Sequence, residues 1–473
     1  MQNDFSQGPV HRNILRLALP MTFAQLVNVL YSIVDRVYIG HIPGASSTAL
    51  TGVGLTFPIL LIITAFANLF GTGGAPLFSI ARGAQNHRYA ARVMGNTCCL
   101  LAAFGLLLTA GLLIFKRPLL YLFGASDATF PYANSYLTVY LTGSVFVMFS
   151  LGMNGFINAQ GFGRRGMATV LIGAVINLLL DPLFIFVFRM GVAGAALATV
   201  LSQFASALWA VGFLRGRRSL IRLSLRAMRP DPAIIGKILS LGMAGFIMAI
   251  TTSLVQVVCN ATLQHYGGDI FVGVMTVLTS VREVVSAPVG GLVNGAQPVM
   301  SFNYGAKKYA RVQSGIRFLS WACILYTTAA WLLMFLFPEV FIAPFTADSA
   351  LIAAGRSAMH IYFFGFFMMS LQMAGQAVAV ALGRSGQAVF FSLLRKAFIV
   401  VPLTLLLPHL WGLGANGVFW AEPVSNFVGG AACFITMMLT IWPSLKQAAQ
   451  QQAAQAQGDA PPAADPGEGP AHS

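Results

Sequence analysis

Charged residues are scarce in this sequence. Only 9% of its 473 residues are Asp, Glu, Lys or Arg, whereas 57% are hydrophobic, and a soluble chain carries about a quarter charged residues. So few charges cannot cover a water-facing surface. The apolar residues form long runs without the alternation of a barrel strand, and each run is long enough to cross a bilayer as a helix. The composition therefore predicts an all-α integral membrane protein.

Other absences exclude whole classes of function. The five cysteines lie in apolar segments without CxxC spacing, and the seven histidines are scattered without an HExxH motif, so neither a disulfide framework nor a zinc enzyme is indicated. Gly236-Lys237 is followed by Ile instead of Ser or Thr, which excludes the phosphate loop of an ATP-driven pump. The polar N-terminus is not followed by a short apolar region with a cleavage site, so we expect no signal peptide. Because no nucleophile or metal constellation stands out, we do not expect an enzyme. The net charge of +15 is spread over short gaps between apolar runs, so we expect no nucleic-acid partner.

Breaking the sequence at Gly, Pro and charge clusters predicts twelve membrane-spanning helices. The segments are about 14–40, 50–75, 91–115, 132–157, 168–188, 191–215, 234–264, 270–298, 313–337, 355–381, 387–409 and 414–441. Most of the 28 Lys and Arg residues lie in gaps on one side, and only Lys116, Arg117 and Arg189 lie in gaps on the other. The positive-inside rule therefore predicts that both termini are cytoplasmic. Arg395 and Lys396, inside a predicted span, are expected to snorkel to its cytoplasmic end, with a substrate contact as the alternative.

The chain divides into two related halves at a basic linker, residues 216–233. The segment Gly73 to Ala84 (GGAPLFSIARGA) resembles Gly295 to Ala306 (GAQPVMSFNYGA), and Pro182 falls over Pro402. Six spans in each half give both halves the same orientation in the membrane, an arrangement found in secondary transporters. The predicted regions are an N-terminal cytoplasmic tail 1–13, a first six-helix bundle 14–215, the linker, a second six-helix bundle 234–441 and a disordered cytoplasmic tail 442–473.

Polar side chains inside three spans of the first half are predicted to meet at one depth. They are an acid on the first span, an amide and an acid one turn apart on the fifth, and a hydroxyl on the sixth: Asp35, Asn177, Asp181 and Thr199. All three spans carry their groups about 8 to 12 Å from the outer end. Two close carboxylates cannot both stay charged in a low dielectric, so the cluster suits a small cation or a shared proton. The alternative is that Asp35 pairs with Arg36 and that Asp181 bonds backbone groups freed by Pro182.

Further polar stripes predict where a substrate contacts the protein. The residues lie on the first, seventh, eighth and tenth spans: Gln25, Asn28, Ser32, Gln256, Asn260, Glu283, Gln372 and Gln376. Glu283, near the middle of its span, would meet a cationic substrate or would form a local ion pair with Arg282. Glu422, which falls over Thr199 in the repeat, is similarly ambiguous.

The first span (LALPMTFAQLVNVLYSIVDRVYIG), the repeated Gly-Ala segments and the Asn177-x-x-x-Asp181-Pro182 element resemble the MATE (multidrug and toxic compound extrusion) family. The resemblance covers about residues 10–445 and is closest to the MepA-like group, near the DinF-type branch. It implies two six-helix bundles in the bacterial cytoplasmic membrane. It also implies antiport in which H+ or Na+ drives the export of amphipathic organic cations, and hence drug and antibiotic resistance.

The same resemblance assigns the coupling site. The first-bundle cation site of the family matches Asp35, Asn177, Asp181 and Thr199, and Asp35 and Asp181 would be metal ligands if the ion is Na+. No cofactor other than the coupling ion is implied. The NorM-type branch has acids on the seventh and tenth spans, where this sequence has Gln256, Gln372 and Gln376.

Two other functions stay open. A flippase for a lipid-linked oligosaccharide belongs to the same superfamily, but it would need a larger and more cationic cavity for a diphosphate head group. A passive channel would need no coupling site. The buried acids favour small organic cations as substrates, and we expect a monomer surrounded by membrane lipids.

Overall fold

The computed structural model describes residues 4–40, 46–345, 349–410 and 412–458, and the regular structure in these ranges is helical. The first bundle contains α1 (Val10–Gly40), α2 (Ser46–Gly54), α3 (Phe57–Gly83), α4 (His87–Leu122), α5 (Phe130–Thr142), α6 (Ser144–Ala159), α7 (Gly163–Pro182), a π-helical turn (Leu183–Val187) and α8 (Gly191–Arg215). The second contains α9 (Pro232–Gly305), α10 (Tyr309–Leu336), α11 (Pro338–Ile342), α12 (Ser349–Tyr362), α13 (Phe366–Ala381), α14 (Ser385–Leu393), a π-helical segment (Leu394–Val400), α15 (Val401–Leu406), a 3-10 turn (Leu407–His409), α16 (Ala415–Thr436), a π-helical turn (Met437–Ile441) and α17 (Trp442–Gly458).

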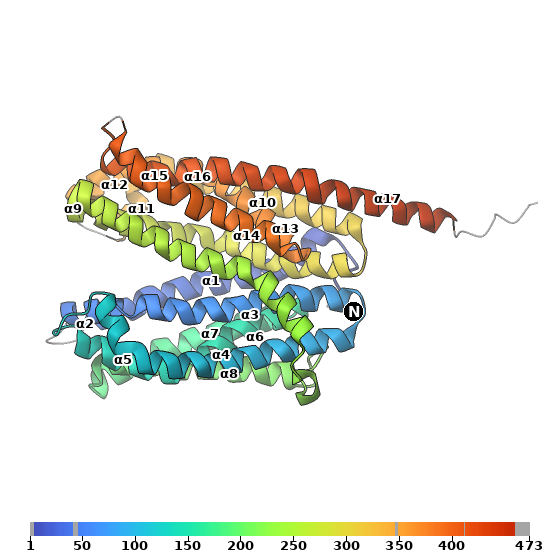
Figure 1. Cartoon of the computed structure of the whole chain (residues 1–473), viewed down its shortest axis with the longest axis horizontal. Helices are drawn as coiled ribbons and strands as arrows, with labels where there is room; N and C mark the ends of the chain where they lie inside the picture. Colours follow the sequence, from blue (N-terminus) through green and yellow to red (C-terminus); the bar gives the residue numbers. More distant parts are fainter. Residues whose placement is uncertain (1–3, 41–45, 346–348, 411, 459–473) are drawn as a thin grey trace, which may run out of the picture.

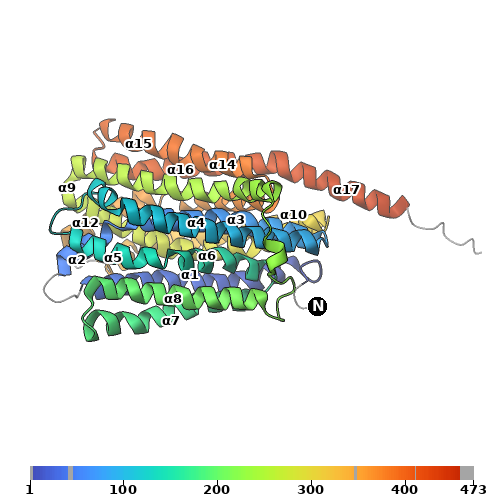
Figure 2. The same ribbon diagram turned by 60° about the horizontal axis from the view of Figure 1, so that its bottom comes forward.

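The helices form two bundles that lie side by side (Figure 1). The N-terminus, α17 and the linker with its 3-10 turn (Leu225–Met228) all lie at the same end of the molecule, and Figure 2 shows α17 projecting beyond that end. Helix α9 is broken at Gly268, where φ is +65° and ψ is −164°, so its two parts are separate spans, Pro232–Gly268 and Ile270–Gly305. In the described ranges, ten helices are long and apolar enough to cross a membrane, and two bent pairs bring the number to twelve if each pair is one span. The prediction of an all-α membrane protein with two bundles is therefore confirmed.

Two predicted spans are bent, which the sequence reading did not anticipate. The span predicted at 132–157 consists of α5 and α6, which meet at 55°, and the span predicted at 355–381 consists of α12 and α13, which meet at 51°. Gly143 at the first bend packs against the side chain of Val200. Gly365 at the second bend has φ +74°, a conformation that glycine adopts without steric cost. A glycine thus stands at each bend, and a simple hydropathy pattern treats it as part of one run.

Two helices continue past the prolines at which the predicted spans end. The predicted ends at 75 and 298 are too early, because α3 carries Pro76 inside it and reaches Gly83, while α9 carries Pro298 and reaches Gly305. Proline is tolerated inside membrane helices because neighbouring helices, polar side chains and local adjustments satisfy the freed backbone groups.

The C-terminal segment is helical where a disordered tail was expected. A π-helical turn joins α16 to α17, so helical structure extends through Gly458, and the prediction of disorder is wrong for residues 442–458. Ala and Gln, which dominate this segment, have high helix propensity. At its start the guanidinium of Arg317 lies 5.0 Å from the ring centroid of Trp442, and Leu445 is buried. Residues 459–473 lie outside the described part of the chain.

The two repeated Gly-Ala segments pack against each other where the bundles meet. A Cβ atom on Gly83 of α3 would meet the carbonyl oxygen of Phe302 of α9, and one on Gly305 would meet the carbonyl oxygen of Ile80. Between them the guanidinium of Arg82 lies 4.9 Å from the ring centroid of Phe302. The glycines of the repeat thus permit a close approach of α3 and α9.

We expect Gly305→Ala to destabilise the protein, whereas Gly290→Ala on the same helix should not. The added methyl at 305 meets backbone atoms, which cannot move aside, and overpacking of this kind costs about 1–3 kcal/mol. Nothing lies within 4 Å of a Cβ at Gly290, and alanine favours a helix over glycine by about 1 kcal/mol. Thermal unfolding of the two purified variants compares them directly. Equal melting temperatures would contradict the proposed contact.

Candidate functional site

Asp35 of α1 and Asp181 of α7 form an acid pair. Their carboxyl groups lie close enough to act on each other electrostatically. Asp181 is buried, and its Oδ1 accepts a hydrogen bond from Nδ2 of Asn177 at 3.2 Å. Nδ2 of Asn177 also lies 3.4 Å from Oγ1 of Thr199, whose hydroxyl donates to the carbonyl of Ala195. The structure thus brings together the four residues of the predicted coupling cluster.

The closeness of the two carboxyl groups limits the charge that they can carry together. Two ionised carboxylates this close would repel each other unless a proton or another cation lay between them. The side chain of Arg36, the alternative partner of Asp35, lies outside the described part of the chain, and that pairing stays a hypothesis.

Two tyrosines that the predicted cluster does not include lie beside the acid pair. Tyr31 of α1 and Tyr136 of α5 both interact electrostatically with the two carboxyls. Tyr136 is buried, and its ring stacks on that of Tyr140 with centroids 6.1 Å apart. Tyr31 lies four residues before Asp35, so helical spacing alone would have found it. No comparable signal points to Tyr136, because it comes from a span without an acid of its own.

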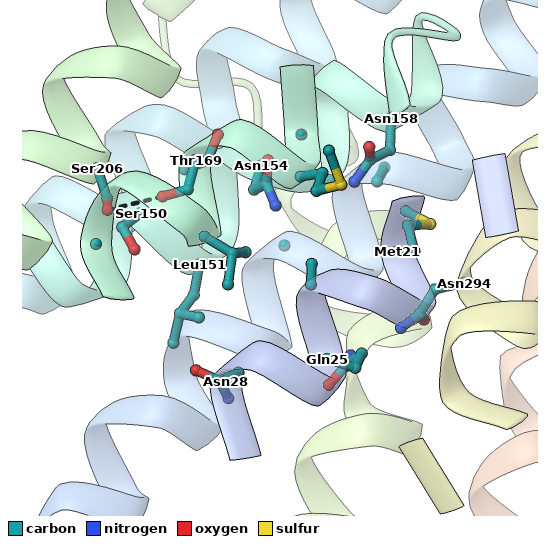
Figure 3. Close-up of a pocket in the computed structure, with 18 of the residues that line it drawn as sticks. Met21, Gln25, Asn28, Ser150, Leu151, Asn154, Asn158, Thr169, Ser206 and Asn294 are labelled. Carbon is teal, nitrogen blue, oxygen red and sulfur yellow. Dashed lines mark hydrogen bonds between the residues drawn. The ribbon is translucent and has the colours of Figure 1, made fainter. Parts of the chain in front are cut away.

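A cavity of about 280 Å³ lies inside the first bundle. Helices α1, α3, α6, α7 and α8 form its walls, and residues of α9 contribute to one side. Figure 3 shows the amide side chains of α1, α6 and α9 around it: Gln25, Asn28, Asn154, Asn158 and Asn294. Among the described residues, those that line the cavity include no acidic or basic side chain. Its volume is just below the usual range for sites that bind drug-sized ligands.

The cavity lies about one helical turn from the predicted coupling cluster. Tyr31, Ala174 and Ser202 line the cavity, and each lies three or four residues along its helix from a residue of the cluster: Asp35, Asn177 and Thr199 respectively. Residues at this spacing are neighbours on a helix.

Two amide oxygens in the cavity wall accept no hydrogen bond within the described part of the chain. They are the Oδ1 atoms of Asn154 and Asn158, and both are buried. Neighbouring polar groups are paired: the hydroxyl of Ser150 donates to Gln203 at 2.5 Å, and that of Ser206 donates to the Thr169 carbonyl at 2.9 Å (Figure 3). Leaving a buried acceptor unsatisfied costs about 1–3 kcal/mol. The wall therefore favours a ligand that carries hydrogen-bond donors.

The predicted substrate residues do not all reach this cavity. Gln25 and Asn28 line it, whereas the hydroxyl of Ser32 donates to the Asn28 carbonyl at 2.9 Å. In the second bundle, Gln372 donates to the carbonyl of Phe391 and Gln376 donates to Ser392, and these bonds join α13 to α14.

The remaining predicted residues lie on α9. Nε2 of Gln256 donates to Oδ1 of Asn260 at 3.2 Å, and Gln256 lines a separate, much smaller pocket in the second bundle. Glu283 is exposed, as is Thr276 on the same helix, and Ser280 between them is half-buried. The structure thus separates the predicted substrate residues into two groups, one in each bundle.

Three basic side chains surround a single buried acid in the second bundle. We call Arg282, Arg395, Lys396 and Glu422 the Glu422 cluster. Nη1 of Arg282 lies 3.1 Å from Oε1 of the acid, Nζ of Lys396 lies 3.3 and 3.4 Å from its two oxygens, and Nη2 of Arg395 also donates to Oε1. The expectation that Arg395 and Lys396 snorkel to the membrane surface is wrong, because both are buried against an opposite charge. The ion pair of Arg282 is made with Glu422, from a distant part of the sequence, and not with Glu283.

The sequence matches one family of known proteins in both bundles. The family model MatE matches residues 20–183 and 245–406. The multidrug export protein MepA of Staphylococcus aureus (strain N315) is 24% identical over 440 residues, which cover 93% of this chain and 95% of that protein. The protein of the same name from Staphylococcus saprophyticus is 23% identical over the same coverage.

Solved structures share the fold. The outward-facing conformation of a multidrug resistance MATE family transporter of the MOP superfamily superimposes with a TM-score of 0.88 at 24% identity, covering 94% of this chain and 98% of that one. A MOP superfamily transporter from Pyrococcus furiosus gives the same TM-score and identity, covering 93% and 98%. At this level of identity the likeness establishes the architecture of two bundles.

Proposed function

This chain belongs to the MATE family of membrane transporters, and on that premise we propose that it exports small organic compounds in exchange for H+ or Na+. The observation that carries the proposal is the closeness of Asp35 to Asp181 beside an uncharged, amide-lined cavity. Ionisable groups in membrane helices are costly and are retained where they act on ions or substrates. The acid pair supplies a cation site, and the cavity supplies a substrate site next to it.

One helix links the two sites. Helix α1 carries Asp35, and five residues of the same helix line the cavity: Met21, Ala24, Gln25, Asn28 and Tyr31. Binding of a cation neutralises the acid pair, and its release restores the repulsion between two carboxylates. A shift of α1 in response to that change would alter the cavity wall directly. We propose that this movement couples cation entry to substrate release.

The identity of the coupling ion follows from how the acid pair is neutralised. A proton would be shared between Asp35 and Asp181, whereas Na+ would need their carboxylates together with oxygens of Asn177 and Thr199. Proteoliposomes given a pH gradient or a sodium gradient separately, with a fluorescent organic cation as the substrate, distinguish these two cases. Export without either gradient would exclude cation-coupled antiport.

The cavity lining also indicates the class of substrate. Unsatisfied acceptor oxygens of Asn154 and Asn158 favour N–H or O–H donors, and apolar side chains such as Met21, Leu151 and Met167 complete the wall. Positive charge on a ligand would be attracted by the neighbouring acid pair when that pair is ionised. We therefore propose amphipathic organic compounds with donor groups, cationic ones above all. We further propose that the end carrying α17 and the basic linker faces the cytoplasm, as the positive-inside rule predicts.

The flippase alternative is less well supported. A diphosphate head group needs several basic side chains around a wide cavity. The basic side chains of the second bundle instead surround Glu422, where the adjoining pocket of about 10 Å³ holds roughly one water. The large cavity has an uncharged lining and an acidic neighbour, which favours cations over diphosphates.

We expect Asn154→Leu to raise the KM for cationic substrates by about 5- to 10-fold, the equivalent of one lost hydrogen bond of about 1 kcal/mol. Leucine keeps the branched shape of the side chain but replaces the amide with two methyl groups, which removes the acceptor oxygen. Asn260→Leu is the matched control, because Asn260 lies in the second bundle outside the cavity. Transport assays on both variants over a range of substrate concentrations measure the difference. A larger effect at 260 than at 154 would move the substrate site to the second bundle.

A further inference from the structure

The Glu422 cluster contains more positive charge than its one acid can balance. Arg395 and Lys396 are each 6% exposed and Glu422 is 5% exposed. Glu283 also acts electrostatically on Arg282, but it is an exposed side chain. Burying an uncompensated charge is strongly unfavourable unless a counter-charge accompanies it. The inside of the cluster therefore has a deficit of negative charge.

The hydrogen-bond donors of the cluster also outnumber the acceptors. A guanidinium has five N–H donors and an ammonium has three, yet one oxygen of Glu422 accepts from all three basic side chains. The Nε of Arg395 is buried and has no acceptor among the described residues. The ring of Tyr362 lies beside Arg282, with 5.9 Å from Cζ to the ring centroid. The cluster therefore has more hydrogen-bond donors than Glu422 has oxygen atoms to accept them.

A small pocket adjoins two of the three basic side chains, and Arg395 is not among the residues that line it. Lys396, Arg282 and Glu422 line it together with Gln256 and Tyr362, and its volume of about 10 Å³ is roughly that of one water-sized particle. The side chain of Arg282 retains 18% exposure, so the cluster is not sealed from outside. The space suits a monatomic ion and excludes a phosphate or an organic acid.

The repeat places this cluster at the counterpart of the first-bundle cation site. Cys259 falls over Asp35 in the repeat, and Glu422 falls over Thr199. Cys259 lines the same pocket as Lys396 and Glu422. The two bundles thus carry sites of opposite charge at equivalent positions, acidic in the first and basic in the second.

We propose that the second bundle binds a chloride-sized monovalent anion in the pocket between Arg282 and Lys396. The anion accepts hydrogen bonds from Arg282 and Lys396, which line the pocket, and it balances the excess positive charge. The pocket walls set its size, and Glu422 keeps the basic side chains oriented around it. The anion would be a resident ion of the second bundle, separate from the coupling cation of the first.

Thermal unfolding of the purified full-length protein tests the proposal without any transport assay, so its outcome is independent of the proposed function. Sodium chloride is replaced stepwise by sodium gluconate at constant sodium concentration, because gluconate is too large for the pocket. We expect chloride to raise the melting temperature by about 2–4 °C with saturation, and bromide to do the same, as binding to the folded state requires. Lys396→Met should abolish the increment. Lys116→Met, which removes a lysine bonded to Thr138 in the first bundle, should retain it.

Equal melting temperatures in chloride and gluconate would overturn the proposal, as would an increment that survives in Lys396→Met. If Lys396→Met does not fold, crystals of the unaltered protein grown in sodium bromide replace it. An anomalous peak between Arg282 and Lys396 would support the site. A map with no peak there would overturn it.

Discussion

Asp35→Asn and Asp181→Asn are each expected to reduce gradient-driven export to the level of empty liposomes. The neutral amide keeps the shape of the side chain and can still hydrogen-bond across the acid pair, but it cannot take up or release a proton. It also removes one of the two charges that would hold Na+. Uptake of a fluorescent organic cation into inverted proteoliposomes under an imposed gradient measures the loss. Folding should be nearly intact, which size-exclusion chromatography and thermal unfolding check.

The double variant provides a second criterion. Because Asp35 and Asp181 share one site, the combined change should cost no more than either single change, as expected for residues that act as a unit. The matched control is Glu339→Gln, which neutralises an exposed acid paired with Arg356 at 3.4 Å. Its export should equal that of the parent protein. If either single variant of the acid pair still moves substrate uphill at the parental rate, coupling lies elsewhere, and the Glu422 cluster becomes the leading candidate.

Glu422→Gln is expected to lower the free energy of unfolding by about 3–5 kcal/mol, the usual cost of removing one partner of a buried ion pair. The change leaves three basic side chains without their shared counter-charge. Thermal unfolding in detergent measures the effect. Glu283→Gln is the matched control, because it neutralises an exposed acid beside Arg282 on the same helix and should change stability little. A Glu422→Gln protein as stable as the parent would show that the cluster does not depend on this acid.

A compensating change sharpens the same test. Adding Lys396→Met to Glu422→Gln removes one of the uncompensated charges, so part of the lost stability should return. The two changes contact each other and should therefore be non-additive. The combination Glu422→Gln with Lys116→Met, whose lysine lies in the other bundle, should show simple addition. Recovery in the first double variant alone would assign the loss to buried charge and not to a general defect in packing.

The candidate sites differ in how far the sequence predicts them. Asn177 and Asp181 lie one turn apart on one helix, and Asp35 and Thr199 lie at a similar depth on neighbouring spans, so distances along the chain were enough to group them. Tyr136 belongs to a different helix at no such spacing, and only the packing of α5 brings it to the carboxyls. Helix packing also separates the predicted substrate residues into two groups, one in each bundle. A polar stripe shows which face of a helix avoids lipid, but it does not show which neighbour that face meets.

The sequence by itself determined that this chain folds in a membrane, and it also determined the number of spans, the repeat and the residues of the acidic cluster. Each of these follows from hydropathy, spacing or internal similarity, which are properties of the chain read in one dimension. Only the tertiary structure decided that Arg282, Arg395 and Lys396 meet Glu422, that α5 and α12 bend against their partners, and that the repeated glycines let α3 approach α9. A buried charge is stabilised by whichever opposite charge the fold brings within a few ångströms, and that partner can lie 140 residues away, as Glu422 does from Arg282.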